Sequence, residues 1–84
     1  MRTSEGIVIE ANALGTLMFT LRQIGGERDN EHVPYFWDHR HVLPGNGNGP
    51  RLAIQAGALL GRKVRVHYEA DGVRYAHKIE EIEP

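Results

Sequence analysis

The last third of the chain carries the pattern that most restricts its fold. Apolar and polar residues alternate over residues 63–70 and again over 73–82, and Asp71-Gly72 separates the two runs. Alternation with a period of two is typical of a β-strand with one buried face, and Asp-Gly is a preferred pair for a two-residue hairpin turn. The pattern therefore predicts an amphipathic β-hairpin at the end of the chain.

The two-residue turn also sets which residues of this hairpin face each other. Its core face is predicted to pair Ala70 with Val73, Tyr68 with Tyr75, Val66 with His77 and Val64 with Ile79. Its outer face is predicted to pair Glu69 with Arg74, His67 with Ala76, Arg65 with Lys78 and Lys63 with Glu80. Like charges that face each other across a ladder cost free energy. The pairing of Arg65 with Lys78 therefore points either to an anion bound on this face or to screening by Glu69 and Glu80 from diagonal positions.

Alternation also predicts a hairpin near the N-terminus, with strands over residues 6–14 and 16–24 and a loop that includes Gly15. The register that places the apolar side chains on one face pairs Ile9 with Phe19. The predicted core face consists of Ile7, Ile9, Ala11, Leu17, Phe19 and Leu21. The predicted outer face consists of Val8, Glu10, Asn12, Met18, Thr20 and Arg22.

Between the two hairpins the sequence predicts a third strand, a loop and a helix. Residues 35–42 are aromatic and predict a strand with a loose edge. Residues 44–50 contain three glycines and two prolines, which predicts a flexible loop. Residues 52–60 have apolar side chains near helical spacing, which predicts a helix of one or two turns that ends before Gly61.

Length and composition favour one folded domain over residues 1–84, with the flexible loop at 44–50 inside it. An apolar fraction of 40% and a charged fraction of 25% are ordinary for a globular protein. The absence of cysteine excludes disulfides, thiolate metal ligands and cysteine nucleophiles. No apolar run is long enough for a membrane span or a signal peptide, so a cytoplasmic location without membrane contact is expected.

Three short segments carry a further signal: Gly6-Ile7-Val8-Ile9-Glu10-Ala11, Met18-Phe19-Thr20-Leu21 and Leu60-Gly61-Arg62-Lys63-Val64-Arg65-Val66. They resemble segments of bacterial translation initiation factor one and related S1-like domains. Together with the element order, the resemblance implies an all-β domain with one short helix, a five-stranded OB-like closed barrel. The family's basic stretch and arginine-rich C-terminus are replaced here by residues 44–50 and by the acidic segment 79–83.

The OB-like fold leads to a prediction of modest binding to single-stranded nucleic acid, with RNA expected before DNA. Such barrels bind single strands across the face of their second and third strands, using aromatic rings for stacking and cations for phosphates. The net charge of −1 disfavours strong non-specific binding but allows a local basic face. The candidate residues are Arg22, Tyr35, Phe36, Trp37, Arg40, Lys63, Arg65, His67, Arg74 and Lys78.

Two other functions remain open at this stage. An exposed aromatic patch over residues 35–37 would equally serve a protein partner, as in an accessory subunit. A metal site is the third hypothesis, because two histidines at i and i+2 share one face of a strand and imidazole suits zinc or copper(II). Its candidate ligands are His32, Asp38, His39 and His41.

No enzyme activity and no cofactor are expected from this sequence. Ser4 is the only serine, and it lies in an N-terminal segment that is expected to be loosely held. A serine nucleophile with a supporting base is therefore not predicted.

Overall fold

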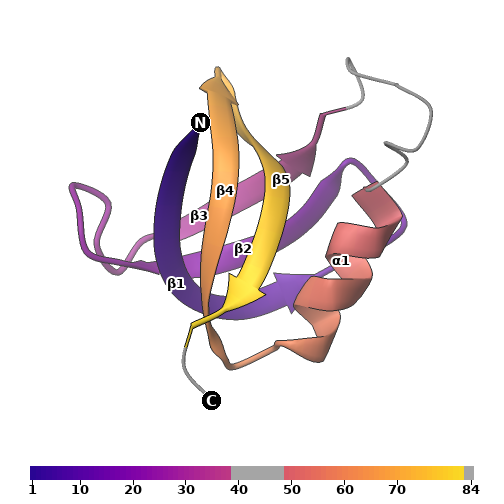
Figure 1. The fold of residues 1–84 in the computed structure, drawn as a ribbon, viewed down its shortest axis with the longest axis horizontal. Coiled ribbons are helices and arrows are strands. Elements are labelled where there is room, and N and C mark those ends of the chain that lie inside the picture. Colours follow the sequence, from indigo (N-terminus) through magenta and orange to yellow (C-terminus); the bar gives the residue numbers. More distant parts are fainter. Residues whose placement is uncertain (39–48, 83–84) are drawn as a thin grey trace.

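A computed structural model describes residues 1–38 and 49–82 of the chain. It contains five strands and one helix (Figure 1). In chain order they are β1 (Arg2–Ala11), β2 (Leu17–Ile24), β3 (His32–Trp37), α1 (Gly49–Ala58), β4 (Lys63–Asp71) and β5 (Val73–Glu81). This order, with the helix between the third and fourth strands, is the predicted one.

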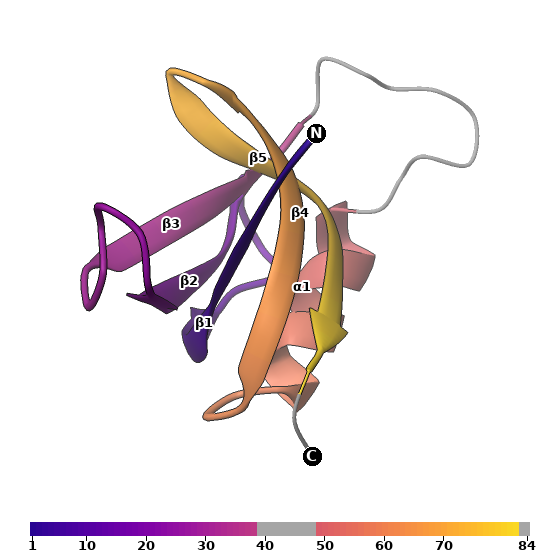
Figure 2. The same cartoon turned by 60° about the vertical axis from the view of Figure 1, so that its left-hand side comes forward.

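The five strands form one sheet that closes into a ring. The order around the ring is β1-β2-β3-β5-β4, and β4 pairs with β1 to complete it (Figures 1 and 2). All pairings are antiparallel except β3 with β5, which run parallel. The prediction of a mostly β domain with a closed five-stranded sheet is confirmed.

The core fills the inside of the ring and continues under α1. Its largest fully buried side chains are Tyr35, Phe19, Met18, Leu21, Val8, Val33, Val64 and Val66. From α1, Leu52, Ala53 and Ala56 join this cluster, and the helix packs against β1, β2 and β5. The helix buries one stripe, since Ile54 stays 66% exposed. Within the described residues, no helix has the length and apolarity needed to cross a bilayer.

The predicted register of the first hairpin is wrong: Ala11 faces Phe19 and not Leu17, and β1 also contains a bulge. Ala11 faces Phe19 and Val8 faces Leu21, which leaves Ile9 as an extra residue in β1. A bulge re-aims the neighbouring side chains. Val8 is accordingly 1% exposed and Ile9 39% exposed, the reverse of the predicted faces.

A second irregularity places Met18 in the core. In the pairing of β2 with β3, Leu17 faces Phe36 and Phe19 faces Tyr35, so Met18 has no opposite residue. Met18 and Phe19 are consecutive, yet each is only 1% exposed. The predicted outward position of Met18 is therefore wrong.

Several predicted boundaries also shift. The N-terminal segment is not loose, because β1 begins at Arg2 and Glu5 faces Arg65 of β4. The third strand begins at His32, earlier than predicted, and residues 39–42 lie outside the described part of the chain. The helix already begins at Gly49, inside the predicted loop, while residues 44–48 of that loop also lie outside the described part.

The last hairpin forms with the predicted core face on β4 but with a different register. Tyr68 faces Ala76 and His67 faces Lys78, which makes His77 the extra residue of a bulge in β5. Arg65 then faces Glu80, not Lys78. The predicted like-charge pair does not exist, so the anion predicted from it has no support on this face.

Candidate nucleic-acid interface

An open pocket of about 330 Å³ lies where the β4–β5 hairpin turns. Its lining comes from the β2–β3 loop, from β3 and from the hairpin, and consists of Arg28, Pro34, Ala70, Gly72, Val73 and Arg74. The parallel pairing of β3 with β5 brings these parts together, because Tyr35, next to Pro34, faces Arg74. Gly72 has a φ of 76°, which a turn between two paired strands requires and glycine adopts without strain.

Arg74 is the most unusual residue of this pocket. Its Nη1 donates hydrogen bonds to Tyr35 Oη at 2.8 Å and to Gln23 Oε1 at 3.0 Å. Its guanidinium carbon lies 4.5 Å from the ring centre of Tyr68, within the range of a cation–π contact. All of these partners are neutral, and no described carboxylate forms an ion pair with Arg74. The half-buried guanidinium therefore has no negative partner among the described residues and can attract an anion into the pocket.

The predicted aromatic patch is only partly exposed. Tyr35 is fully buried and stacks on Phe19, with ring centres 5.2 Å apart. Phe36 is half-buried, and Trp37 is half-buried and packs against the core. The buried ring of Tyr35 is therefore not accessible for stacking on a base, and its hydroxyl accepts a hydrogen bond from Arg74.

The cations on the outer face of the last hairpin are held by carboxylates. Nη2 of Arg65 donates to Glu5 Oε2 at 2.9 Å, and Nη1 of Arg65 lies 3.8 Å from Glu80 Oε1. His67 Nε2 lies 3.0 Å from Glu80 Oε1, and Lys78 Nζ lies 3.8 Å from Glu80 Oε2. This part of the predicted basic face is therefore largely neutralised.

The remaining predicted cations are scattered. Arg22 is exposed on β2 and donates to Asn30 Oδ1 at 3.2 Å. Lys63 is half-buried at the start of β4, far along the strand from the turn at Gly72. Arg40 lies outside the described residues. Of the nine predicted residues that the structure describes, only Arg74 lines the pocket.

The pKa of Glu80 is lowered, and the largest cause is the hydrogen bond with His67. Burial has a smaller effect than this hydrogen bond and raises the pKa, while the nearby charges of Lys78, His67 and Arg65 lower it further. A carboxyl group whose pKa is lower in the folded state than in the unfolded state stabilises the fold at pH values above the unfolded-state pKa. This stabilisation is lost as the pH falls through the folded-state pKa.

We therefore expect the wild type to lose more stability than Glu80→Gln as the pH falls below about 4.5, the ordinary value for Glu. Urea unfolding of both proteins over a series of pH values measures the difference. Glu10→Gln, a change at an exposed carboxylate of β1, serves as the control and should follow the wild type. Parallel curves for the wild type and Glu80→Gln would contradict this account of Glu80.

The two predicted metal ligands that the structure describes, His32 and Asp38, are not brought together. His32 is exposed at the first position of β3, and Asp38 is buried just after its last position. At a rise of about 3.3 Å per residue, the strand separates them by roughly 20 Å. His39 and His41 lie outside the described residues. Asp38 lies instead beside Glu69 and His77, two residues that were not among the predicted ligands.

No protein-family model, curated protein or solved structure matches this chain. The candidate interface thus rests on the geometry of its own residues.

Sequence reasoning missed Arg28, Pro34 and Val73 as parts of the interface. The Asp-Gly pair locates the turn beside which Val73 lies, but the other two residues reach the pocket only through the pairing of β3 with β5. That pairing is parallel and spans residues far apart in the sequence, so no local pattern indicates it.

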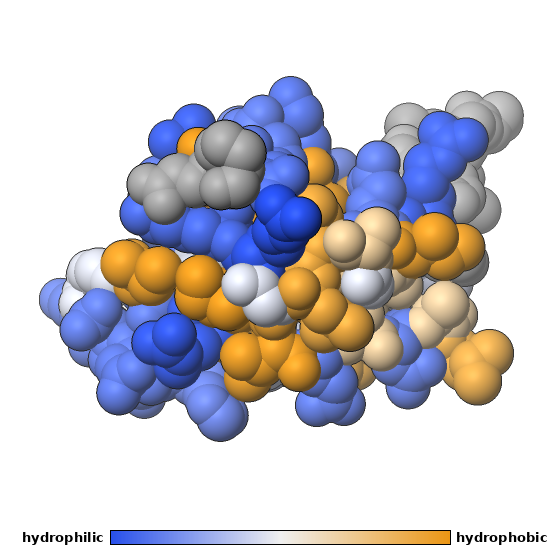
Figure 3. Space-filling model, turned by 90° about the horizontal axis from the view of Figure 1, so that it is seen from below, coloured by the Kyte–Doolittle hydropathy of each residue, from blue (hydrophilic) through white to orange (hydrophobic). Residues whose placement is uncertain are grey.

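A second surface is apolar. Figure 3 shows apolar side chains gathered in a band on the face seen from below. Exposed large apolar residues include Ile9 of β1, Ile54 of α1 and Leu60, and a bridge between Val8 and Leu60 joins β1 to the segment after the helix. This surface lies away from the β4–β5 turn, at the opposite end of β4 in Figure 1.

Proposed function

We propose that this chain is an OB-type barrel that binds single-stranded nucleic acid, RNA before DNA, through the pocket at the β4–β5 turn. The observation that carries the proposal is Arg74, a half-buried guanidinium that lines an open pocket and is held only by neutral described partners. Charged groups removed from water are normally paired. A phosphate oxygen would supply the missing negative partner in this pocket.

The position of the pocket supports the same proposal. OB-type barrels bind oligonucleotides on the face of their second and third strands, with loops that close over it, among them the loop between the fourth and fifth strands. Here Arg28 comes from the β2–β3 loop, Pro34 from β3 and Val73 from the β4–β5 turn. The two arginines would bind phosphates, and the two apolar residues would contact a sugar or base. The volume of about 330 Å³ suits one nucleotide.

The proposal is tested at Arg28, because this side chain is exposed and can be changed without disturbing the core. Its Nε lies 3.4 Å from Glu31 Oε2. Arg28→Gln should weaken binding of a single-stranded RNA several-fold and reduce the slope of log affinity against log salt by about 0.7. Fluorescence anisotropy titrations at several salt concentrations measure both quantities, and the same titrations with DNA compare the two nucleic acids.

Arg62→Gln is the matched control for this experiment. Arg62 is also an exposed, ion-paired arginine, 3.0 Å from Glu81 Oε2, but it lies just before β4 and thus at the other end of that strand. Its loss should leave both affinity and salt slope close to those of the wild type. Equal losses from Arg28→Gln and Arg62→Gln, or binding that does not respond to salt, would contradict the pocket as the binding site.

A protein-interaction role is the second candidate function. Exposed apolar side chains on adjoining elements, such as Ile9, Ile54 and Leu60, support it, since contiguous apolar surface is common at interaction sites. An absence of oligonucleotide binding at low salt would favour this candidate over the first.

A further inference from the structure

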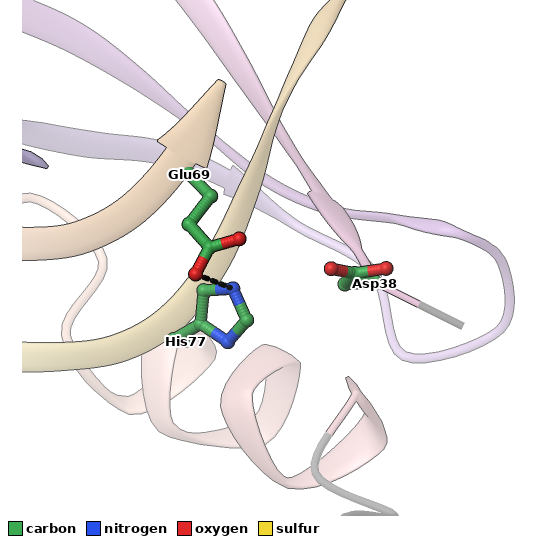
Figure 4. Close-up of side chains that lie close together, drawn as sticks. All are labelled: Asp38, Glu69 and His77. Carbon is green, nitrogen blue, oxygen red and sulfur yellow. Dashed lines mark ion pairs between the residues drawn. The ribbon is translucent and has the colours of Figure 1, made fainter. Parts of the chain in front are cut away.

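Three potential metal ligands from separate elements meet beside the end of β3. They are Asp38, directly after β3, Glu69 of β4 and His77 of β5, and their ligand atoms all lie within 4.8 Å of one another (Figure 4). The parallel pairing of Trp37 with Ala76 places the residues that follow, Asp38 and His77, next to each other. The hairpin of β4 and β5 adds Glu69.

His77 carries the strongest indication of a missing partner. Its Nε2 is buried but makes no hydrogen bond with the described residues, and Glu69 Oε1 lies 3.9 Å away, too far for one. Buried polar atoms are nearly always satisfied, so an exception calls for an explanation such as an unseen ion. His77 is also the bulge residue of β5, and bulges commonly re-aim a side chain toward a functional site.

We propose that Asp38, Glu69 and His77 bind a divalent transition-metal ion of the zinc class. Zinc takes imidazole nitrogen and carboxylate oxygen at about 2.0–2.2 Å, which sets the ligand atoms of a tetrahedral site roughly 3.3 Å apart. The present separations of up to 4.8 Å need only a small closure, and Glu69 can supply it because its side chain is 48% exposed.

The ligand chemistry selects this class of ion. Two carboxylates and one neutral imidazole balance the charge of a divalent cation, whereas calcium and magnesium prefer sites built from oxygen alone. Three protein ligands leave a fourth tetrahedral position for water or for a ligand atom of another molecule. The site is independent of the proposed nucleic-acid pocket, with which it shares no residue.

The experiment is a zinc titration by calorimetry on the full chain after treatment with a chelator and its removal. The wild type should bind about one equivalent of Zn²⁺, and the metal should raise its melting temperature because it binds the folded state. His77→Gln and Glu69→Gln should each lower the affinity by at least the ~10–100-fold typical of losses around metal sites, and should abolish the thermal shift.

A second His–Glu pair on the same hairpin provides the matched control. His67 Nε2 lies 3.0 Å from Glu80 Oε1, so this histidine already has a partner. His67→Gln should leave zinc affinity unchanged. The site would be overturned by a wild type that binds no zinc, by binding that survives both His77→Gln and Glu69→Gln, or by an equal loss in His67→Gln. Because Glu69 is partly exposed, its variant keeps the test valid even where His77→Gln is poorly folded.

Discussion

Gly6→Ala should destabilise the protein by about 3 kcal/mol, the upper range for added volume in a packed interior. Gly6 is buried in β1, between Gln23 of β2 and Val64 of β4. A methyl group there would lie 2.6 Å from the backbone oxygen of Arg22 and 3.2 Å from its carbonyl carbon. Neither atom belongs to a flexible side chain, so the strands themselves would have to separate. Thermal unfolding should show a fall in melting temperature on the order of 15 °C.

Gly15→Ala is the matched control for this prediction. Gly15 lies in the loop between β1 and β2, and a methyl group there would meet nothing within 4 Å. Its expected effect is within about 0.5 kcal/mol, as for other surface substitutions. Similar melting temperatures for Gly6→Ala and Gly15→Ala would contradict the close approach of β1 to β2.

Met18→Ala and Phe19→Ala should both be strongly destabilising, although the two residues are neighbours in a strand. Each side chain is fully buried in the core. Truncation of a buried methionine costs about 2–5 kcal/mol and that of a buried phenylalanine about 3–5 kcal/mol, because apolar contacts are lost and a cavity remains. Urea unfolding of each variant measures the losses.

Ile54→Ala gives the comparison for these two changes. Ile54 is a large apolar residue that is 66% exposed on α1, so its truncation should change stability far less. A cost for Met18→Ala as small as that for Ile54→Ala would show regular alternation along β2 and would contradict the irregular pairing at Met18.

The sequence was sufficient to predict the order of elements and the location of both hairpins. Alternation marks the strands, and the loop after Ala11 and the turn at Asp71-Gly72 separate them close to the observed boundaries. The buried face of β4, with Val64, Val66 and Tyr68, was also predictable because that strand is regular. Each of these features follows from a residue pattern within one short segment of the chain.

The registers were not predictable for a physical reason. Regular alternation assumes one opposite residue for every position, and the bulges at Ile9 and His77 break this assumption. The register of the last hairpin already differs by one residue at the turn, where Asp71 faces Val73. The bulge at His77 shifts the partners by one more, so Arg65 comes to face Glu80 and not Lys78. Neither Ile9 nor His77 is a glycine, and both residue types are ordinary in strands, so the sequence does not mark the bulges.

The two candidate sites were least predictable, since both depend on β3 lying parallel to β5. This pairing places Pro34 near the β4–β5 turn and Asp38 near His77. The sequence identified Asp38 as a possible ligand and Arg74 as a possible contact, but it did not indicate the neighbours that the structure places beside them. Both sites are formed by contacts between segments that are far apart in the sequence.

Mapping of an RNA complex by nuclear magnetic resonance tests the proposed binding site most directly. A short single-stranded RNA would be titrated into isotopically labelled protein while the backbone amide signals are followed. The largest shifts should fall on Arg28 and on the turn from Ala70 to Arg74, because these residues line the pocket. Shifts confined to the surface around Ile54 and Leu60, or no shifts at low salt, would contradict the account.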